Sequence, residues 1–225
     1  MFTLTCDAIL FDLDGVLVDS SQVIARQRQR WATRANVDMN HIRQIWHGRR
    51  AFEIIRAVAP HLDLEEESRW MRDAEAVDVE GVVVQPGARE LLASLPNGTW
   101  AIATSGPRPV ALARLKATGL PIPRAFITGD DVAHGKPNPE PYLRAAQALG
   151  VVPERCVVIE DAVAGIEAGL AAGAQVIAVP TSHAVDELTH ATAILARIAD
   201  LAVVVNGANK ETHGQLTLRG PIAQA

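Results

Sequence analysis

The sequence lacks the features that mark several protein classes. It has only two cysteines, Cys6 and Cys156, in or beside apolar runs, so we expect small buried thiols without a redox or nucleophilic role. No apolar run is long enough to span a membrane, and Asp7, Asp12 and Asp14 interrupt the apolar stretch at the N-terminus, which argues against a signal peptide. These absences predict a cytoplasmic protein without a membrane partner.

Positive charge is scattered along the chain and is supplied almost entirely by arginine. The net charge is −5, and the basic residues form neither a tail nor a continuous block, so nucleic acid is not an expected partner. Lysine is limited to Lys116, Lys136 and Lys210. An isolated lysine in a structured loop is therefore a candidate functional residue. We expect a monomer or a weak homodimer.

Hydrophobic residues make up 48% of the 225-residue chain, enough to bury about 70% of the surface that the unfolded chain exposes. Nearly continuous apolar runs are typical of strands that are buried on both faces of a parallel sheet. Five such runs are "CDAILF", "TWAIAT", "RCVVIE", "QVIAVP" and "LAVVV". Helical patterns that close near glycines separate them. The sequence therefore predicts an α/β fold with a doubly wound parallel sheet.

One long segment breaks this alternation. Residues 16–86 contain amphipathic patterns such as "SQVIARQRQRWATRA" but no comparable strand, and they are far too long for an ordinary crossover connection. We interpret them as an inserted all-helical domain, bounded by Gly15 and by the "QPG" of residues 85–87. Residues 1–15 and 87–225 then form a Rossmann-like core. The polar tail after Asn206 contains one expected edge strand at "QLTLR".

Polar side chains follow three of the predicted strands. In open parallel sheets, ligands bind beyond the carboxyl ends of the strands, so these side chains are expected to meet at one edge. The first strand is followed by Asp12, Asp14 and Gly15, the second by Thr104, Ser105 and Gly106, and the third by Glu160 and Asp161.

The carboxylates predict a metal site. Asp12 and Asp14 stand two residues apart, so both side chains can lean toward the same space, and Gly15 permits a sharp turn behind them. Carboxylates gathered in a small site repel one another unless a cation lies among them. A set of oxygen ligands without nearby cysteine or histidine favours Mg²⁺, with Asp12, Asp14, Glu160 and Asp161 as candidate ligands.

Two further segments suit phosphate. In "ATSGPRPVAL" the backbone N–H groups at the start of a helix can bind a phosphoryl group, with Ser105 and Gly106 as candidate substrate-binding residues. In "HGKPNPEPY" three prolines stiffen the loop that carries Lys136. A fixed ammonium beside carboxylates and a phosphate pocket suits phosphoryl transfer.

Four ordered motifs resemble those of the haloacid dehalogenase-type phosphatase superfamily. They are "DLDGVLVDS", "AIATSG", "GKPNPEPY" and "VVIEDAVAGIEAG", and the resemblance covers residues 5 to about 205. It implies a Mg²⁺-dependent phosphomonoesterase that acts on a small phosphorylated metabolite through an aspartyl-phosphate. The inserted domain corresponds to the family's helical cap, whose closure excludes water.

The resemblance also implies residue roles. Asp12 would be the nucleophile. Asp14 would protonate the leaving oxygen, activate water and lend its backbone carbonyl to the metal. Thr104 and the N–H of Ser105 would hold the phosphoryl group, Lys136 would neutralise charge, and Asp161, with Glu160 beside it, would bind Mg²⁺.

In the family that the motifs resemble, dehalogenases and phosphonatases generally lack a carboxylate at the position of Asp14, so the resemblance implies phosphate-ester chemistry. "WHGRR", residues 46–50, and "DDVAHGKPNPEPYLRAAQALG" are similar to the sugar-phosphate and glycerol-phosphate phosphatase branch. In the first of these segments His47 and Arg49 are candidate substrate-binding residues, because an arginine fork can grip a phosphate or hydroxyl. Arg50 belongs to the same group, and for these arginines the alternative is a solvated position, since arginines on amphipathic helices are mostly solvated.

Other interpretations stay open. A β-phosphoglucomutase-like enzyme would use the same aspartyl-phosphate to isomerise a phosphosugar, and a receiver-like signalling module would also combine an aspartate, a hydroxyl residue, a lysine and Mg²⁺. Among the remaining polar residues, Asp130 and Asp131 are expected to shape their loop. Asp19 and Ser20 are expected to cap the following helix, and His134 is expected to be structural.

Overall fold

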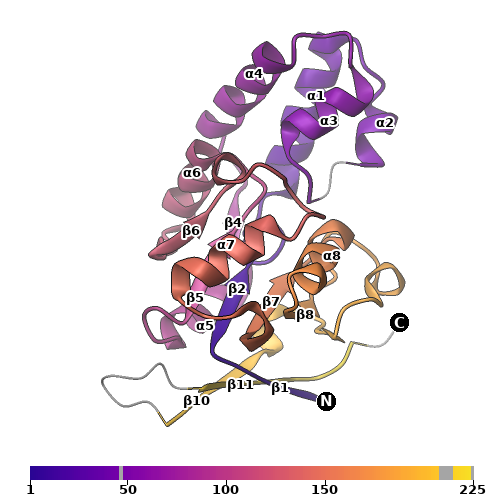
Figure 1. Ribbon diagram of the computed structural model, residues 1–225. Helices are drawn as coiled ribbons and strands as arrows, with labels where there is room; N and C mark the ends of the chain where they lie inside the picture. Colours follow the sequence, from indigo (N-terminus) through magenta and orange to yellow (C-terminus); the bar gives the residue numbers. More distant parts are fainter. Residues whose placement is uncertain (46–47, 208–214, 224–225) are drawn as a thin grey trace.

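The computed structural model describes residues 1–45, 48–207 and 215–223. Its centre is a six-stranded sheet of order β6-β5-β2-β7-β8-β9 (Figure 1), in which all neighbouring strands are parallel. The strands are β2 (Ala8–Phe11), β5 (Trp100–Ala103), β6 (Ala125–Ile127), β7 (Cys156–Glu160), β8 (Gln175–Ala178) and β9 (Ala193–Ile194). This confirms the predicted α/β class.

Both faces of the central sheet are covered, which explains the continuous apolar runs. Successive side chains of a strand point to opposite faces. In β2, Ile9 and Phe11 join the core that includes α5 and α6, whereas Ala8 and Leu10 join the core that includes α7 and α8. These helices are α5 (Ala88–Ser94), α6 (Arg108–Thr118), α7 (Glu140–Leu149) and α8 (Val163–Ala171).

Chain order places a switch point at β2. From β2 the chain continues to β5 and β6 on one side, then returns to β7, β8 and β9 on the other. Crevices form beyond the carboxyl ends of strands where the order reverses. The ends of β2, β5 and β7 are therefore the expected place for a site.

Four helices lie between β3 (Val18–Asp19) and β4 (Val83–Val84) in the chain and gather at one end of the molecule (Figure 1). They are α1 (Ser21–Ala35), α2 (Met39–Arg43), α3 (Ala51–Val58) and α4 (Leu64–Val77), called here the insertion helices. They have a core of their own, which includes the buried side chains of Trp31, Ile54 and Met71. The connections to the central sheet run through a short antiparallel pair, β3 (Val18–Asp19) and β4 (Val83–Val84).

A second sheet corrects two predictions. "LAVVV" contributes β10 (Ala202–Asn206) to an antiparallel sheet of order β1-β11-β10, not to the parallel sheet. Its residues alternate between exposed and half-buried, as expected for a strand with one covered face. The "QLTLR" strand, β11 (Gln215–Gly220), is central rather than an edge, because β1 (Phe2–Cys6) and β10 pair with its two sides.

The two cysteines are buried and free. Burial is the main cause that raises the pKa of each thiol to about 12, so both stay protonated near neutral pH, as expected for inert core thiols. No helix in the described ranges has the length and apolarity needed to cross a bilayer.

Candidate active site

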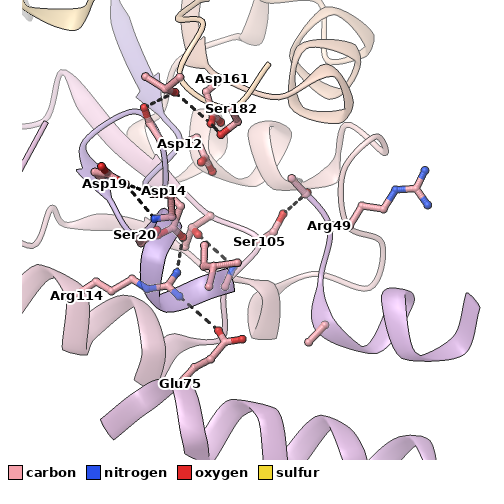
Figure 2. Close-up of a pocket in the computed structure, with 18 of the residues that line it drawn as sticks. Asp12, Asp14, Asp19, Ser20, Arg49, Glu75, Ser105, Arg114, Asp161 and Ser182 are labelled. Carbon is pink, nitrogen blue, oxygen red and sulfur yellow. Dashed lines mark hydrogen bonds and ion pairs between the residues drawn. The ribbon is translucent and has the colours of Figure 1, made fainter. Parts of the chain in front are cut away.

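The end of β2 delivers Asp12 and Asp14 into one cavity (Figure 2). Asp12 is only 7% exposed. Gly15 has φ +85°, and a Cβ there would lie 1.9 Å from Asp161 Oδ2. Only glycine therefore lets the turn after β2 pass this close to the carboxylate that follows β7.

Lys136 is fully buried and joins two strand ends. Its Nζ donates to Asp12 Oδ1 and to Glu160 Oε1, both at 2.6 Å. Burial opposes the charged form of Lys136, but the two carboxylates outweigh this effect and raise its pKa above the ordinary value. The ammonium is therefore charged across the neutral range, and it fixes the position of Asp12.

Glu160 supports the site from behind. Its Oε1 also accepts a hydrogen bond from Tyr142 Oη (2.8 Å), and its Oε2 accepts from the N–H groups of Asp161 (2.8 Å) and Ala162 (3.1 Å). Burial would raise the pKa of Glu160, but the charge of Lys136 and these hydrogen bonds hold it below the ordinary value. With four donors, both carboxylate oxygens are occupied.

The carboxylates of Asp12, Glu160 and Asp161 form a group that fits a divalent cation. Oxygens from all three lie within 4.8 Å of one another. Three carboxylates and one ammonium leave an excess of two negative charges. Burial, and then the neighbouring carboxylates, raise the pKa of Asp161 well above its usual range, and burial does the same for Asp12 despite Lys136. A hard divalent cation would relieve this repulsion.

Because Glu160 is saturated with donors, Asp12 and Asp161 are the members of the group best able to bind the cation. Asp14 lies outside the group of carboxylates that meet within 4.8 Å. If Asp14 binds the metal, it would do so through its backbone carbonyl, as the family resemblance implies.

The second strand end offers a phosphoryl pocket beside Asp12. Thr104 and Ser105 follow β5 and line the cavity. Thr104 Oγ1 accepts from the Gly106 N–H (3.1 Å), which leaves its hydroxyl proton for a ligand. The Ser105 N–H has no acceptor among the described residues. At the start of α6, however, the Arg108 N–H donates to Asp130 Oδ2 (2.8 Å), so fewer N–H groups are open than the sequence suggested.

Asp14 occupies a different wall from the metal-binding group. Its Oδ1 accepts from Ser20 Oγ and its Oδ2 from Arg114 Nη1, both at 2.6 Å. The Ser20 hydroxyl makes no cap hydrogen bond to α1, contrary to the expected capping role. Asp19 Oδ1 instead accepts from the Ser21 N–H (3.0 Å).

The cavity has a volume of about 390 Å³ and is enclosed from both sides. The central core contributes the strand ends, and the insertion helices contribute side chains such as Arg28, Arg72 and Glu75. Volumes of this size suit small metabolites. Polar side chains at the insertion side suit a ligand rich in hydroxyl groups.

The structure places the described arginines of "WHGRR" in different environments. His47 lies outside the described residues. Arg49 is exposed and lies at the rim, and its guanidinium extends away from Asp12 and Asp14 (Figure 2). Arg50 is buried and donates to the carbonyls of Val132 (3.1 Å) and Ala133 (3.2 Å). Arg50 therefore docks the insertion on the core.

The sequence analysis missed several residues that line the cavity, including four that contact the predicted site residues or each other. Thr181 and Ser182 follow β8 and donate to Asp161 Oδ2, so extending the strand-end rule to a fourth strand would have found them. Arg114 and Glu75 lie on the buried faces of α6 and α4. The signal that could have identified them is their spacing, because each charged residue stands at a position of its helix where the helical period places an apolar residue.

Comparison with known proteins gives consistent results. Residues 6–173 match a family model described as a haloacid dehalogenase-like hydrolase. Hexitol phosphatase A of Escherichia coli (strain K12) is 40% identical over 219 residues, which cover 95% of this chain and 99% of that protein. Glycerol-1-phosphate phosphohydrolase 2 of Saccharomyces cerevisiae is 36% identical over 222 residues, covering 93% and 89%. CbbY from Rhodobacter sphaeroides, in a crystal structure with phosphate, has 27% identity and a TM-score of 0.75, covering 87% and 96%.

Proposed function

The chain belongs to the haloacid dehalogenase-like hydrolases, and from this premise we propose that it hydrolyses a small phosphorylated sugar or polyol, with Mg²⁺, through an aspartyl-phosphate on Asp12. Its class is that of a phosphoric monoester hydrolase, which its relatives share. The observation that carries the proposal is the Asp12 carboxylate, which is fixed by Lys136 at the wall of the cavity.

In the first half-reaction, Asp12 attacks phosphorus and the bond to the leaving oxygen breaks. Thr104 and the Ser105 N–H hold the phosphoryl oxygens, and Asp14 gives its proton to the leaving oxygen. In the second, water attacks the aspartyl-phosphate and Asp14 takes the water proton, which restores Asp12 and releases phosphate. Mg²⁺ held by Asp12 and Asp161 would supply Lewis-acid stabilisation of the phosphoryl charge.

The cavity supports this substrate class. Its volume accommodates a small phosphorylated polyol, and its insertion side presents hydroxyl, amide and charged groups, including Ser21, Gln85 and Arg72. Hydroxyl groups of a sugar or polyol can pair with such side chains. The named activities of the relatives, on hexitol and glycerol phosphates, support the same class.

Phosphate release from hexitol phosphates, glycerol 1-phosphate, 2-deoxyglucose 6-phosphate and phosphoglycolate tests the proposal, with and without excess EDTA. We expect Mg²⁺-dependent release, with higher kcat/KM for the polyol or sugar esters than for phosphoglycolate. Loss of Mg²⁺ should reduce turnover at least about 10²-fold, because metal neutralisation contributes several kcal/mol to the transition state.

Three outcomes would contradict this function. Release that is equally fast in EDTA excludes the metal, and no release from any ester excludes the phosphatase. Conversion of β-glucose 1-phosphate to the 6-phosphate without free phosphate would identify the mutase. The family match favours a hydrolase over the receiver-like alternative, and a long-lived acyl-phosphate that never turns over would be needed to revive that alternative.

A further inference from the structure

Arg114 connects the candidate acid Asp14 to the insertion helices (Figure 2). It lies on α6 of the central core, and its side chain is 3% exposed. One guanidinium nitrogen, Nη1, donates to Asp14 Oδ2 at 2.6 Å, and the other, Nη2, donates to Glu75 Oε2 at 3.4 Å. A single planar fork therefore bridges two carboxylates from separate parts of the chain.

Glu75 brings α4 and α1 into the same network. It is 5% exposed, and its other oxygen, Oε1, accepts from Arg28 Nη1 of α1. Charges thus alternate from Asp14 through Arg114 and Glu75 to Arg28. Since α4 packs directly against α6, this buried network crosses from the insertion helices to the central core.

Asp14 has little freedom in this arrangement. Ser20 occupies one of its oxygens and Arg114 the other. Arg114 in turn has two carboxylate partners among the described residues, Asp14 and Glu75. Loss of either carboxylate would leave the buried guanidinium undercompensated and free to turn, because an unpaired buried charge is costly.

We propose that Arg114 and Glu75 are positioning residues for Asp14, placing the carboxyl that protonates the leaving oxygen. The inference rests on the proposed function, because Asp14 must act there as the acid. Neither residue touches the reacting atoms. They act through the location of Asp14, and a displacement of about 1 Å in a catalytic group can cost about 10² in rate.

Leaving-group dependence separates positioning from general damage. p-Nitrophenolate departs as a stable anion, whereas the alkoxide of glycerol 1-phosphate needs a proton, and general acid catalysis contributes about 10² to 10⁴ in such cases. For both esters, kcat/KM reports the steps up to formation of the aspartyl-phosphate. A displaced Asp14 should therefore slow glycerol 1-phosphate and spare p-nitrophenyl phosphate.

The experiment measures kcat/KM for both esters in the wild type and in Glu75→Gln, Arg114→Lys and Glu67→Gln. Glu67 is the matched control, because it is a buried glutamate on the same helix whose partners, Trp31 and Arg34, lie within the insertion. Lysine at position 114 keeps the charge but cannot bridge two carboxylates, so that variant remains informative if Glu75→Gln fails to fold.

We expect Glu75→Gln and Arg114→Lys to lower kcat/KM for glycerol 1-phosphate by about 10 to 10²-fold and for p-nitrophenyl phosphate by less than about 3-fold. Glu67→Gln should leave the ratio of the two values unchanged. In an Asp14→Asn background, Glu75→Gln should no longer change this ratio, because the acid is already absent.

Equal losses for the two esters, or no loss for either, in both folded variants would overturn the positioning role. A further change of the ratio in the Asp14→Asn background would do so as well. Failure of the wild type to release phosphate from these two esters and from every other ester of the panel above would instead refute the proposed function, so the two failures are distinguishable.

Discussion

Asp12→Asn is expected to lower kcat at least about 10⁴-fold, because an amide cannot replace the carboxylate as the nucleophile that forms the covalent intermediate. Asparagine preserves the shape of the side chain, and its carbonyl oxygen can still accept from Lys136. The fold should therefore persist. Steady-state phosphate release in the presence of Mg²⁺, together with the thermal unfolding midpoint, measures both parts of the prediction.

Asp7→Asn is the matched control for this substitution. Asp7 immediately precedes β2, at the opposite end of that strand from Asp12, and pairs with Arg155 (2.7 Å). We expect its loss to leave kcat within about 3-fold of the wild type, since exposed pairs contribute at most about 1 kcal/mol to stability. Turnover by Asp12→Asn close to that of Asp7→Asn would eliminate Asp12 as the nucleophile.

Lys136→Met is expected to have the second largest effect, on stability as well as turnover. It removes the ammonium that lies 2.6 Å from Asp12 and from Glu160. Breaking a buried ion pair by removing one partner costs about 3–5 kcal/mol, and loss of one electrostatic group at the reacting centre costs about 10² to 10³ in kcat. Urea unfolding at neutral pH and steady-state kinetics measure the two effects.

The pH dependence has a definite sign. The folded pKa of Lys136 lies above its ordinary value of 10.5, so its contribution to stability is fully present below that value and is lost only as the pH rises through the folded pKa. Titration of Lys136 itself should therefore contribute no pH dependence to the unfolding free energy between pH 7 and 9. Lys116→Met, at an exposed position of α6, should be within about 0.5 kcal/mol of the wild type. If the two lysine variants are equally stable and active, Lys136 does not hold the site together.

The central sheet was predictable because burial on both faces leaves a clear signature in the sequence. Ile9 and Phe11 pack on one side of β2, and Ala8 and Leu10 pack on the other, so no polar residue interrupts the run. The end of β2 was predictable for the opposite reason. Asp12 interrupts an apolar stretch where a buried charge needs a compensating partner.

The second sheet was less predictable, because its partners are distant in sequence. β1 and β10 pair with the two sides of β11. The local pattern of "LAVVV" indicates a strand, but it does not indicate that the partner of this strand is β11 and not a strand of the parallel sheet. β6 was missed for a different reason. It has only three residues, Ala125–Ile127, too few for periodicity to distinguish it from a loop.

Side-chain pairing across elements was the least predictable feature. The proline-stiffened loop and the family resemblance indicated that Lys136 would lie beside Asp12. They did not indicate that Arg114, on α6, would bridge Asp14 and Glu75, because that contact depends on how α4 packs against α6. A charged residue on the buried face of a helix can be recognised from the sequence as unusual. Its partner, however, can be identified only from the tertiary structure.

The most direct test of the proposed chemistry is to locate the phosphoryl group during turnover. Wild-type enzyme is mixed with a phosphorylated polyol and Mg²⁺, quenched in acid within milliseconds, and reduced with borohydride, which converts an aspartyl-phosphate to homoserine. Peptide mass spectrometry then finds the modified position. We predict that homoserine forms at position 12 and at no other aspartate, and that it forms only when substrate is present. Modification at Asp14 or Asp161, or turnover without any modified aspartate, would contradict the account.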